Sequence, residues 1–232
     1  MTESITFPPL MWGEAATGDA FDHACARATL GCDAGLMSFR NDTSQLQAAL
    51  VLTPEVPLAK AMAMFPACAL GFQNALGALA PPEVAVHLGW TGDIRINGAR
   101  AGQFRMAAAG ADDAPDWLII GLTLDLLPQS DDPGENPHDT CLYAEGCADV
   151  DPAHLIEAYA RHALHWITRW DDEGPAPLHR EWRGLIPDMG EDVTVLGRSG
   201  TFLGLDEDFG LLLRDQDGTQ LIPLTELLER SA

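Results

Sequence analysis

The chain has 232 residues, of which 47% are hydrophobic and 21% charged, a balance typical of a folded globular protein. Its formal net charge at pH 7 is −22, and a surface of that sign repels both nucleic-acid phosphates and anionic lipid headgroups. The N-terminal residues lack the basic and apolar segments of a secretory signal, and we see no apolar run of membrane-spanning length. We therefore expect a cytoplasmic protein that binds neither nucleic acid nor membrane.

The cysteines and the single lysine limit which redox and amine chemistry the protein can perform. The cysteines form no C-x-x-C pair, so we interpret them as reduced thiols in a cytosolic protein. All but one of the 13 basic residues are arginine, and Lys60 is the only lysine. A mechanism that requires a primary amine must therefore use Lys60 or the N-terminal amine.

The first third of the chain predicts a helix, two strands and a second helix. Residues 19–28 are rich in alanine and repeat their apolar side chains at helical spacing. Residues 35–39 and 46–53 have the pattern of two strands joined by a polar turn, and we expect them to form a hairpin. The long apolar helical pattern of residues 57–79 predicts a helix that is broken or kinked near Pro66, because proline cannot donate the hydrogen bond that a helix interior requires.

A tight hairpin is predicted at residues 90–102. Apolar and polar side chains alternate from Asp93 onwards, and Asn97-Gly98 then supplies the two positive-φ residues that a type I′ turn requires. Residues 117–126 follow as a long apolar strand of the kind that is buried on both faces.

In the second half of the chain, the hydrophobic pattern changes from helical to strand spacing at residue 192. Residues 128–139 are a loop by composition, and residues 151–170 predict an amphipathic helix that begins with an N-cap and a proline. From residue 192 onwards the hydrophobic period becomes two, with short strands separated by glycine and aspartate turns. We therefore predict an α+β fold in two domains: residues 1–187, a mixed sheet with helices, and residues 188–232, a small β-barrel.

Five segments resemble the biotin–protein ligase and lipoate–protein ligase family. Residues 90–102 carry W-T-G-D, an aliphatic strand, a turn and R-A-G, where the family has K-W-P-N-D, a strand, a turn and lysine-hydrophobic-glycine. Residues 117–126 are similar to its strand that begins with tryptophan, and residues 139–146 to its A-T-S-L segment. Residues 155–182 resemble its closing helices, and residues 190–213 its small C-terminal barrel. The resemblance implies the fold of that family, without its N-terminal DNA-binding module.

The resemblance also implies a reaction. In the family, a carboxylic acid such as biotin or lipoate reacts with ATP, and the acyl group of the adenylate passes to an acceptor lysine. A glycine- and arginine-rich loop holds the phosphates with backbone N–H groups, and a lysine neutralises the reacting oxyanions. Here residues 40–45, where the loop belongs, contain no glycine, and Arg100 stands at the lysine position. We expect that ATP-dependent adenylation is lost and that small-molecule binding is retained.

The candidate site residues come from the same resemblance. It places Arg100 at the catalytic position, where a guanidinium suits a carboxylate or phosphate. It implies ligand contacts from five further residues, namely Thr17, Trp90, Asp93, Gly102 and Asp125. The residues alone leave alternatives open, since Arg100 also suits a solvent-exposed position, Asp93 a hairpin-shaping role and Trp90 the core. Asp125 occupies a position where the family usually has asparagine. Its negative charge would repel the phosphates of ATP.

Two further patterns are judged not to form sites. The histidines of the 151–170 helix lack a cysteine or carboxylate partner at ligand spacing, so we predict no metal site. Arg100 is out of strand phase with Arg95 and Arg105, so we expect no continuous basic face.

Three functions remain open at this stage. The first is a ligase-like protein that binds a small acid but lacks standard adenylation, with biotin, lipoate or ATP implied as ligands by the resemblance alone. The second is an active acyltransferase that uses Arg100 as an anion clamp and modifies an acceptor protein. The third is a protein-binding scaffold, for example a homodimer formed through its sheet.

Overall fold

Two sheets organise the chain in the computed structural model, which describes residues 5–41, 44–111, 113–128 and 136–229. The strands of the larger sheet are β1 (Trp12–Ala15), β2 (Leu36–Arg40), β3 (Gln45–Leu52), β4 (Val86–Leu88), β5 (Asp93–Ile96), β6 (Ala99–Ala111) and β7 (Ala114–Asp125). Their order in the sheet is β1-β2-β3-β7-β6-β5-β4, with β1 and β2 parallel and the other neighbours antiparallel. The predicted α+β class is confirmed.

The smaller sheet follows at the C-terminal end. Its strands are β8 (Asp192–Val195), β9 (Arg198–Leu205), β10 (Leu211–Asp215) and β11 (Gly218–Ile222), and a 3₁₀ turn, η1 (Leu224–Leu227), comes after them. Each strand pairs antiparallel with the next, in the order β11-β10-β9-β8. Phe202 and Phe209 of this region belong to the same buried cluster as the core of the large sheet, so the two sheets share one continuous core.

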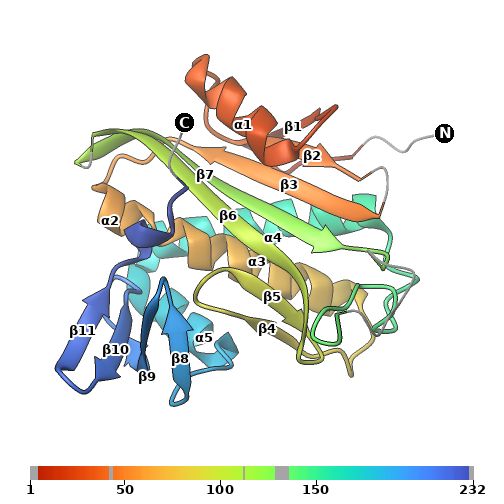
Figure 1. Cartoon of the computed structure of the whole chain (residues 1–232). Coiled ribbons are helices and arrows are strands. Elements are labelled where there is room, and N and C mark those ends of the chain that lie inside the picture. Colours follow the sequence, from red (N-terminus) through yellow and green to blue (C-terminus); the bar gives the residue numbers. More distant parts are fainter. Residues whose placement is uncertain (1–4, 42–43, 112, 129–135, 230–232) are drawn as a thin grey trace.

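Helices cover both faces of the large sheet (Figure 1). They are α1 (Ala20–Thr29), α2 (Leu58–Ala61), α3 (Met64–Leu79), α4 (Pro152–Glu173) and α5 (Pro175–Leu185). The pair α3 and α4 lies on one face, and α1 lies on the other, where it packs on β2, β3 and β7. At Gly71 in α3 an added Cβ would lie 2.6 Å from the backbone nitrogen of Ala163 in α4, so a glycine is needed for this close helix packing.

The helical pattern expected to be broken or kinked near Pro66 is broken just before this residue. The pattern of residues 57–79 divides into two helices, and the division falls at Met62 and Ala63, between α2 and α3. Pro66 lies in the first turn of α3. A first-turn residue has no helical partner for its amide, so proline costs no hydrogen bond there.

The expectation that no apolar run has membrane-spanning length needs correction. Residues 58–79 have the length and composition of such a span, but 72% of their most apolar stretch is buried inside the fold. This burial is typical of a core helix, and it matches the position of α3 between the large sheet and α4 (Figure 1).

The hairpin of β5 and β6 has the predicted turn and an unpredicted bulge. Asn97 and Gly98 have φ values of 51° and 95°, which confirms the two left-handed residues of the turn. A register shift between Ile94 and Arg95 then places Arg95 directly opposite Arg100. The expectation that these arginines are out of phase is therefore wrong, because a bulge inserts one extra residue into a strand pair.

Candidate functional site

Polar side chains gather on the face of the large sheet that carries α1. Directly paired residues of antiparallel strands point to the same face, and Gln45 pairs with Asp125 while Thr123 pairs with both Gln47 and Gln103. Arg105 lies two residues beyond Gln103 on β6, and its side chain therefore points to the same face. We call this set the polar face, and its members are Gln45, Gln47, Gln103, Arg105, Thr123 and Asp125.

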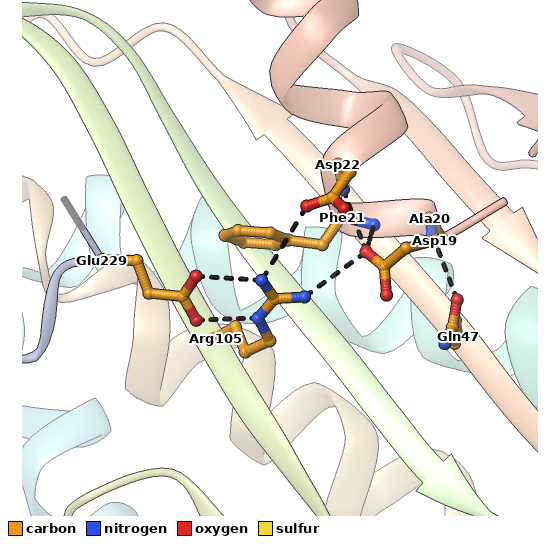
Figure 2. Close-up of polar contacts among 7 residues, drawn as sticks. All are labelled: Asp19, Ala20, Phe21, Asp22, Gln47, Arg105 and Glu229. Carbon is orange, nitrogen blue, oxygen red and sulfur yellow. Dashed lines mark hydrogen bonds and ion pairs between the residues drawn. The ribbon is translucent and has the colours of Figure 1, made fainter. Parts of the chain in front are cut away.

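Arg105 lies at the centre of a cluster of carboxylates (Figure 2). Its Nε and Nη2 donate to the two oxygens of Glu229 at 2.7 and 2.9 Å, and its Nη1 donates to Asp19 at 3.4 Å. The guanidinium carbon lies 4.4 Å from the centre of the Phe21 ring, in cation–π contact. The hydrogen bonds that Arg105 donates to Glu229 raise the pKa of Arg105, so this side chain is firmly cationic.

The N-terminus of α1 is tied to the same cluster. The Asp19 carboxylate accepts the amides of Phe21 and Asp22, both at 3.0 Å, and so caps the helix. The amide of Ala20 donates to the side chain of Gln47 at 3.1 Å, in buried surroundings. Asp19 therefore holds the helix end and Arg105 at once, as Figure 2 shows.

Asp125 and Arg100 lie at the other end of the polar face. The carboxylate of Asp125 accepts a hydrogen bond from Gln45 at 2.7 Å. Burial raises the pKa of Asp125, and the nearby positive charge of Arg100 partly offsets this effect. Arg100 itself is exposed, and its guanidinium donates to Gln103 at 3.1 Å. Within the described ranges no carboxylate lies at ion-pair distance from it.

Replacing Asp125 with asparagine should leave the protein as stable or more stable at neutral pH. Since burial raises the folded-state pKa of Asp125, the folded protein holds this proton more tightly than the unfolded chain does. The wild type therefore loses stability as the pH rises from the unfolded-state pKa through the folded-state pKa, and Asp125→Asn removes that loss. We expect a gain below about 1 kcal/mol, because the carboxylate is half-exposed.

Urea denaturation across the carboxylate titration range measures this effect. The exposed turn residue Asp113 supplies the control variant, Asp113→Asn. A variant at position 125 that is less stable than the wild type at neutral pH, by more than it is at acidic pH, would contradict the expectation.

Trp90 and Asp93 lie at the junction between the hairpin and the C-terminal sheet. The indole of Trp90 is 3% exposed, and its Nε1 donates to the backbone carbonyl of Phe209 at 2.8 Å. Asp93 accepts from Arg95 at 2.7 Å, and Arg95 also forms a two-pronged pair with Asp188, at 3.0 Å for each bond. These contacts fix the hairpin to the chain that enters β8, and they flank a cavity of about 300 Å³.

The last two candidate residues are Gly102, in the sheet, and Thr17, in a connection. Gly102 lies where β6 and β7 approach closely, and a Cβ there would overlap the carbonyl oxygen of Thr123 and lie 3.0 Å from the Cα of Leu124. Thr17 is exposed in the connection between β1 and α1. The structure thus places Asp125 and Arg100 together, with Gly102 paired to Leu124 and Asp93 paired to Gln103 beside them. Trp90 lies at the junction with the C-terminal sheet, and Thr17 lies before α1.

Sequence reasoning missed the Arg105 cluster. Asp19 could have been identified as a helix N-cap, and Arg105 as sharing the strand phase of Gln103. Glu229 carried no such signal, since it is 124 residues from Arg105 in the chain.

Two segments bear on the glycine-rich loop and the lysine that the family resemblance implies. Strand β2 ends at Arg40 and β3 begins at Gln45, so only four residues connect them, and two of these lie outside the described residues. Lys60 is exposed on α2, in the helical layer across the sheet, where it lines a cleft of about 410 Å³ with Trp170. Among the described residues no group of three or more potential metal ligands is found.

Comparison with known families gives the class of protein. The model of the biotin/lipoate A/B protein ligase family matches residues 7–184, and that of a domain of unknown function, DUF4444, matches residues 189–230. The first match covers most of the chain, so the protein belongs to the biotin/lipoate A/B protein ligase family.

Individual relatives agree with this assignment. A biotin–[acetyl-CoA-carboxylase] ligase of Paracoccus denitrificans is 27% identical over 188 residues, which span 77% of each chain. The crystal structure of a biotin protein ligase-like protein of unknown function from Silicibacter sp. has a TM-score of 0.92 at 62% identity, over 98% of this chain and 100% of that one. The apo biotin protein ligase of Aquifex aeolicus has a TM-score of 0.74 at 16% identity, over 94% and 96%, and shows the same fold. The predicted ligase-like fold is confirmed.

Proposed function

We propose that this protein binds a small carboxylic acid on the polar face and does not activate it with ATP. The observation that carries the proposal is the short connection between Arg40 and Gln45. A loop that wraps a triphosphate needs several consecutive backbone N–H groups turned toward the anion, usually with glycines. The four residues of this connection contain none.

The charges near the polar face support the same conclusion. Arg100 and Arg105 each carry a planar guanidinium fork, and one such fork can hold the carboxylate of a small acid. The half-buried carboxylate of Asp125 opposes the approach of a polyanion such as ATP. Lys60 is on α2, in the opposite layer, and so cannot stand in for a lysine at Arg100.

The ligand class follows from the side chains of the polar face. Gln45 and Gln103 offer amide donors and acceptors, and Thr123 offers a hydroxyl. An acid of the biotin, lipoate or medium-chain acyl type could place polar groups against these side chains and its carboxylate against an arginine. We place this binding function in the cytoplasm, where the free cysteines remain reduced.

A binding assay and a turnover assay together test this proposal. Calorimetric titration of the purified protein with biotin, lipoate and octanoate should reveal at least one bound acid whose affinity does not require ATP. Pyrophosphate release with ATP and each acid should stay at background, with the Paracoccus denitrificans ligase and biotin as the positive control. Sustained pyrophosphate release would reject the loss of adenylation, and failure of every acid to bind would reject the binding function.

The exposure of Arg100 favours one second candidate, an acyltransferase that uses a pre-activated donor. Its guanidinium is exposed and makes no ion pair within the described part of the chain, so it is available to an incoming phosphate or carboxylate. With a biotinyl or lipoyl adenylate supplied directly, Arg100→Ala should then reduce transfer to an acceptor lysine about 100-fold. Arg214→Ala, at an exposed position of β10, serves as the control. Transfer that is unchanged in Arg100→Ala rejects this candidate.

A further inference from the structure

The C-terminal segment places a carboxylate on the polar face. Glu229 meets Arg105 through two nearly parallel hydrogen bonds of 2.7 and 2.9 Å, the geometry in which arginine recognises a free carboxylate. The amide of Glu229 also donates to the carbonyl of Met106 at 2.7 Å. Figure 2 shows Glu229 approaching Arg105 from the side opposite Asp19.

We propose that Arg105 is the carboxylate anchor of the ligand site, and that Glu229 occupies this anchor until a small organic acid displaces it. The inference rests on the proposed function for the existence of an acid ligand. It adds the residue that holds the acid group and the internal group that competes with it.

The charges around Arg105 make the two occupants mutually exclusive. Asp19 and Asp22 lie 3.4 and 3.8 Å from the guanidinium, so three carboxylates already surround one positive charge. A further anion would be repelled while Glu229 is in place. Exchange of Glu229 for a ligand carboxylate leaves the local charge unchanged, and it uses the same Nε and Nη2 donors.

The anchor is held in place more firmly than its occupant. Arg105 is part of β6 and would keep its contacts with Asp19 and Phe21 after the exchange. The Glu229 side chain is 43% exposed, and its backbone amide is bonded to the sheet at the carbonyl of Met106. The segment before it stays attached, because Leu224 is 2% exposed. A short tethered group of this kind competes at an effective concentration on the order of millimolar.

The rest of the polar face lies where the body of an anchored acid would extend. Gln103 is two residues from Arg105 on the same face of β6, roughly 7 Å along the strand, and it pairs with Thr123. On the other side of Arg105 the ring of Phe21 closes the surface over Gly121. The ligand would therefore run from Arg105 toward Gln103 and Asp125.

Affinity measurements on the full chain test the competition. Calorimetric titration with biotin, lipoate and octanoate would compare the wild type with Glu229→Gln and Arg105→Gln. Glu229→Gln should tighten binding roughly five-fold, because it weakens a half-exposed ion pair that the acid must displace. Arg105→Gln should weaken binding at least ten-fold. Glu226→Gln is the control, since Glu226 is a nearby carboxylate of the same segment that pairs with Arg198 instead.

A second readout follows the displaced segment directly. Saturation of the wild type with the bound acid should accelerate hydrogen exchange at the Glu229 amide, which loses its bond to Met106, while the amides of β10 remain protected. If an acid binds but Glu229→Gln binds it no more tightly, and the Glu229 amide stays protected, the competition is refuted and the proposed function survives. If no acid binds either the wild type or Glu229→Gln, both proposals fail.

Discussion

Replacing Trp90 with alanine should lower the free energy of unfolding by about 3–5 kcal/mol, the usual cost of removing a large buried aromatic side chain. The indole is 3% exposed within the common core of both sheets, and its Nε1 donates to the carbonyl of Phe209. The variant would open a cavity at the junction and leave that carbonyl unpaired. Chemical denaturation followed by circular dichroism measures the loss.

The conservative variant Trp90→Phe separates packing from hydrogen bonding. It keeps an aromatic ring and removes the donor, so we expect a loss of about 1–2 kcal/mol. Stability close to that of the wild type in Trp90→Ala, combined with weaker acid binding, would show instead that Trp90 contacts a ligand and does not hold the junction.

Replacing Gly102 with valine should be at least as damaging, with a loss of more than about 3 kcal/mol or failure to fold. Any Cβ at this position would overlap the carbonyl oxygen of Thr123 and lie 3.0 Å from the Cα of Leu124. Both are backbone atoms of β7 and cannot move away without breaking the central pairing of the sheet. Thermal unfolding and expression in soluble form measure the effect.

A matched glycine elsewhere gives the opposite expectation. Gly77 is exposed in α3, and the nearest atom to an added Cβ is the mobile end of Gln73 at 4.0 Å. Gly77→Ala should therefore stabilise the protein by up to about 1 kcal/mol, because alanine loses less backbone entropy in a helix. A Gly102→Val protein as stable as this control would disprove the close approach of β6 and β7.

These two predictions bear on how the family motif is interpreted. Trp90, Asp93 and Gly102 are the parts of the hairpin motif that this chain retains, and each has a structural reason to be present. They hold the hairpin to its neighbours whether or not a reaction takes place. Retention of the motif therefore supports the fold, and evidence for activity must come from the polar face and from the assays proposed above.

Much of the local structure followed from the sequence. The cap of the fourth helix at Asp151 was predicted from Asp-Pro, and its side chain accepts the amide of His154 as expected. The turn at Asn97-Gly98 was predicted from the need for positive φ, which both residues show. Signals of this kind are readable because a few neighbouring residues set the backbone conformation.

Other features depended on packing that the sequence pattern does not encode. A break or kink was expected near Pro66, but only the structure shows that the break precedes Pro66, which lies in a first turn where its missing amide is harmless. The bulge beside Arg95 could not be inferred from alternation, because it changes the phase of the strand pair. It sets Arg95 opposite Arg100, yet Arg95 turns to Asp93 and Asp188 while Arg100 bonds to Gln103, so no common basic surface results.

The sequence by itself determined the family, most of the helices and strands after β1, and the absence of glycine from residues 40–45, because short contiguous segments carry each of these signals. Only the tertiary structure decided which charges meet. Arg105 lies between Asp19 and Glu229, partners that are 86 and 124 residues away, and their meeting depends on the docking of α1 and on the path of the C-terminal segment. Long-range packing determines the docking of α1 and the path of the C-terminal segment, and neither can be predicted from a local pattern of residues.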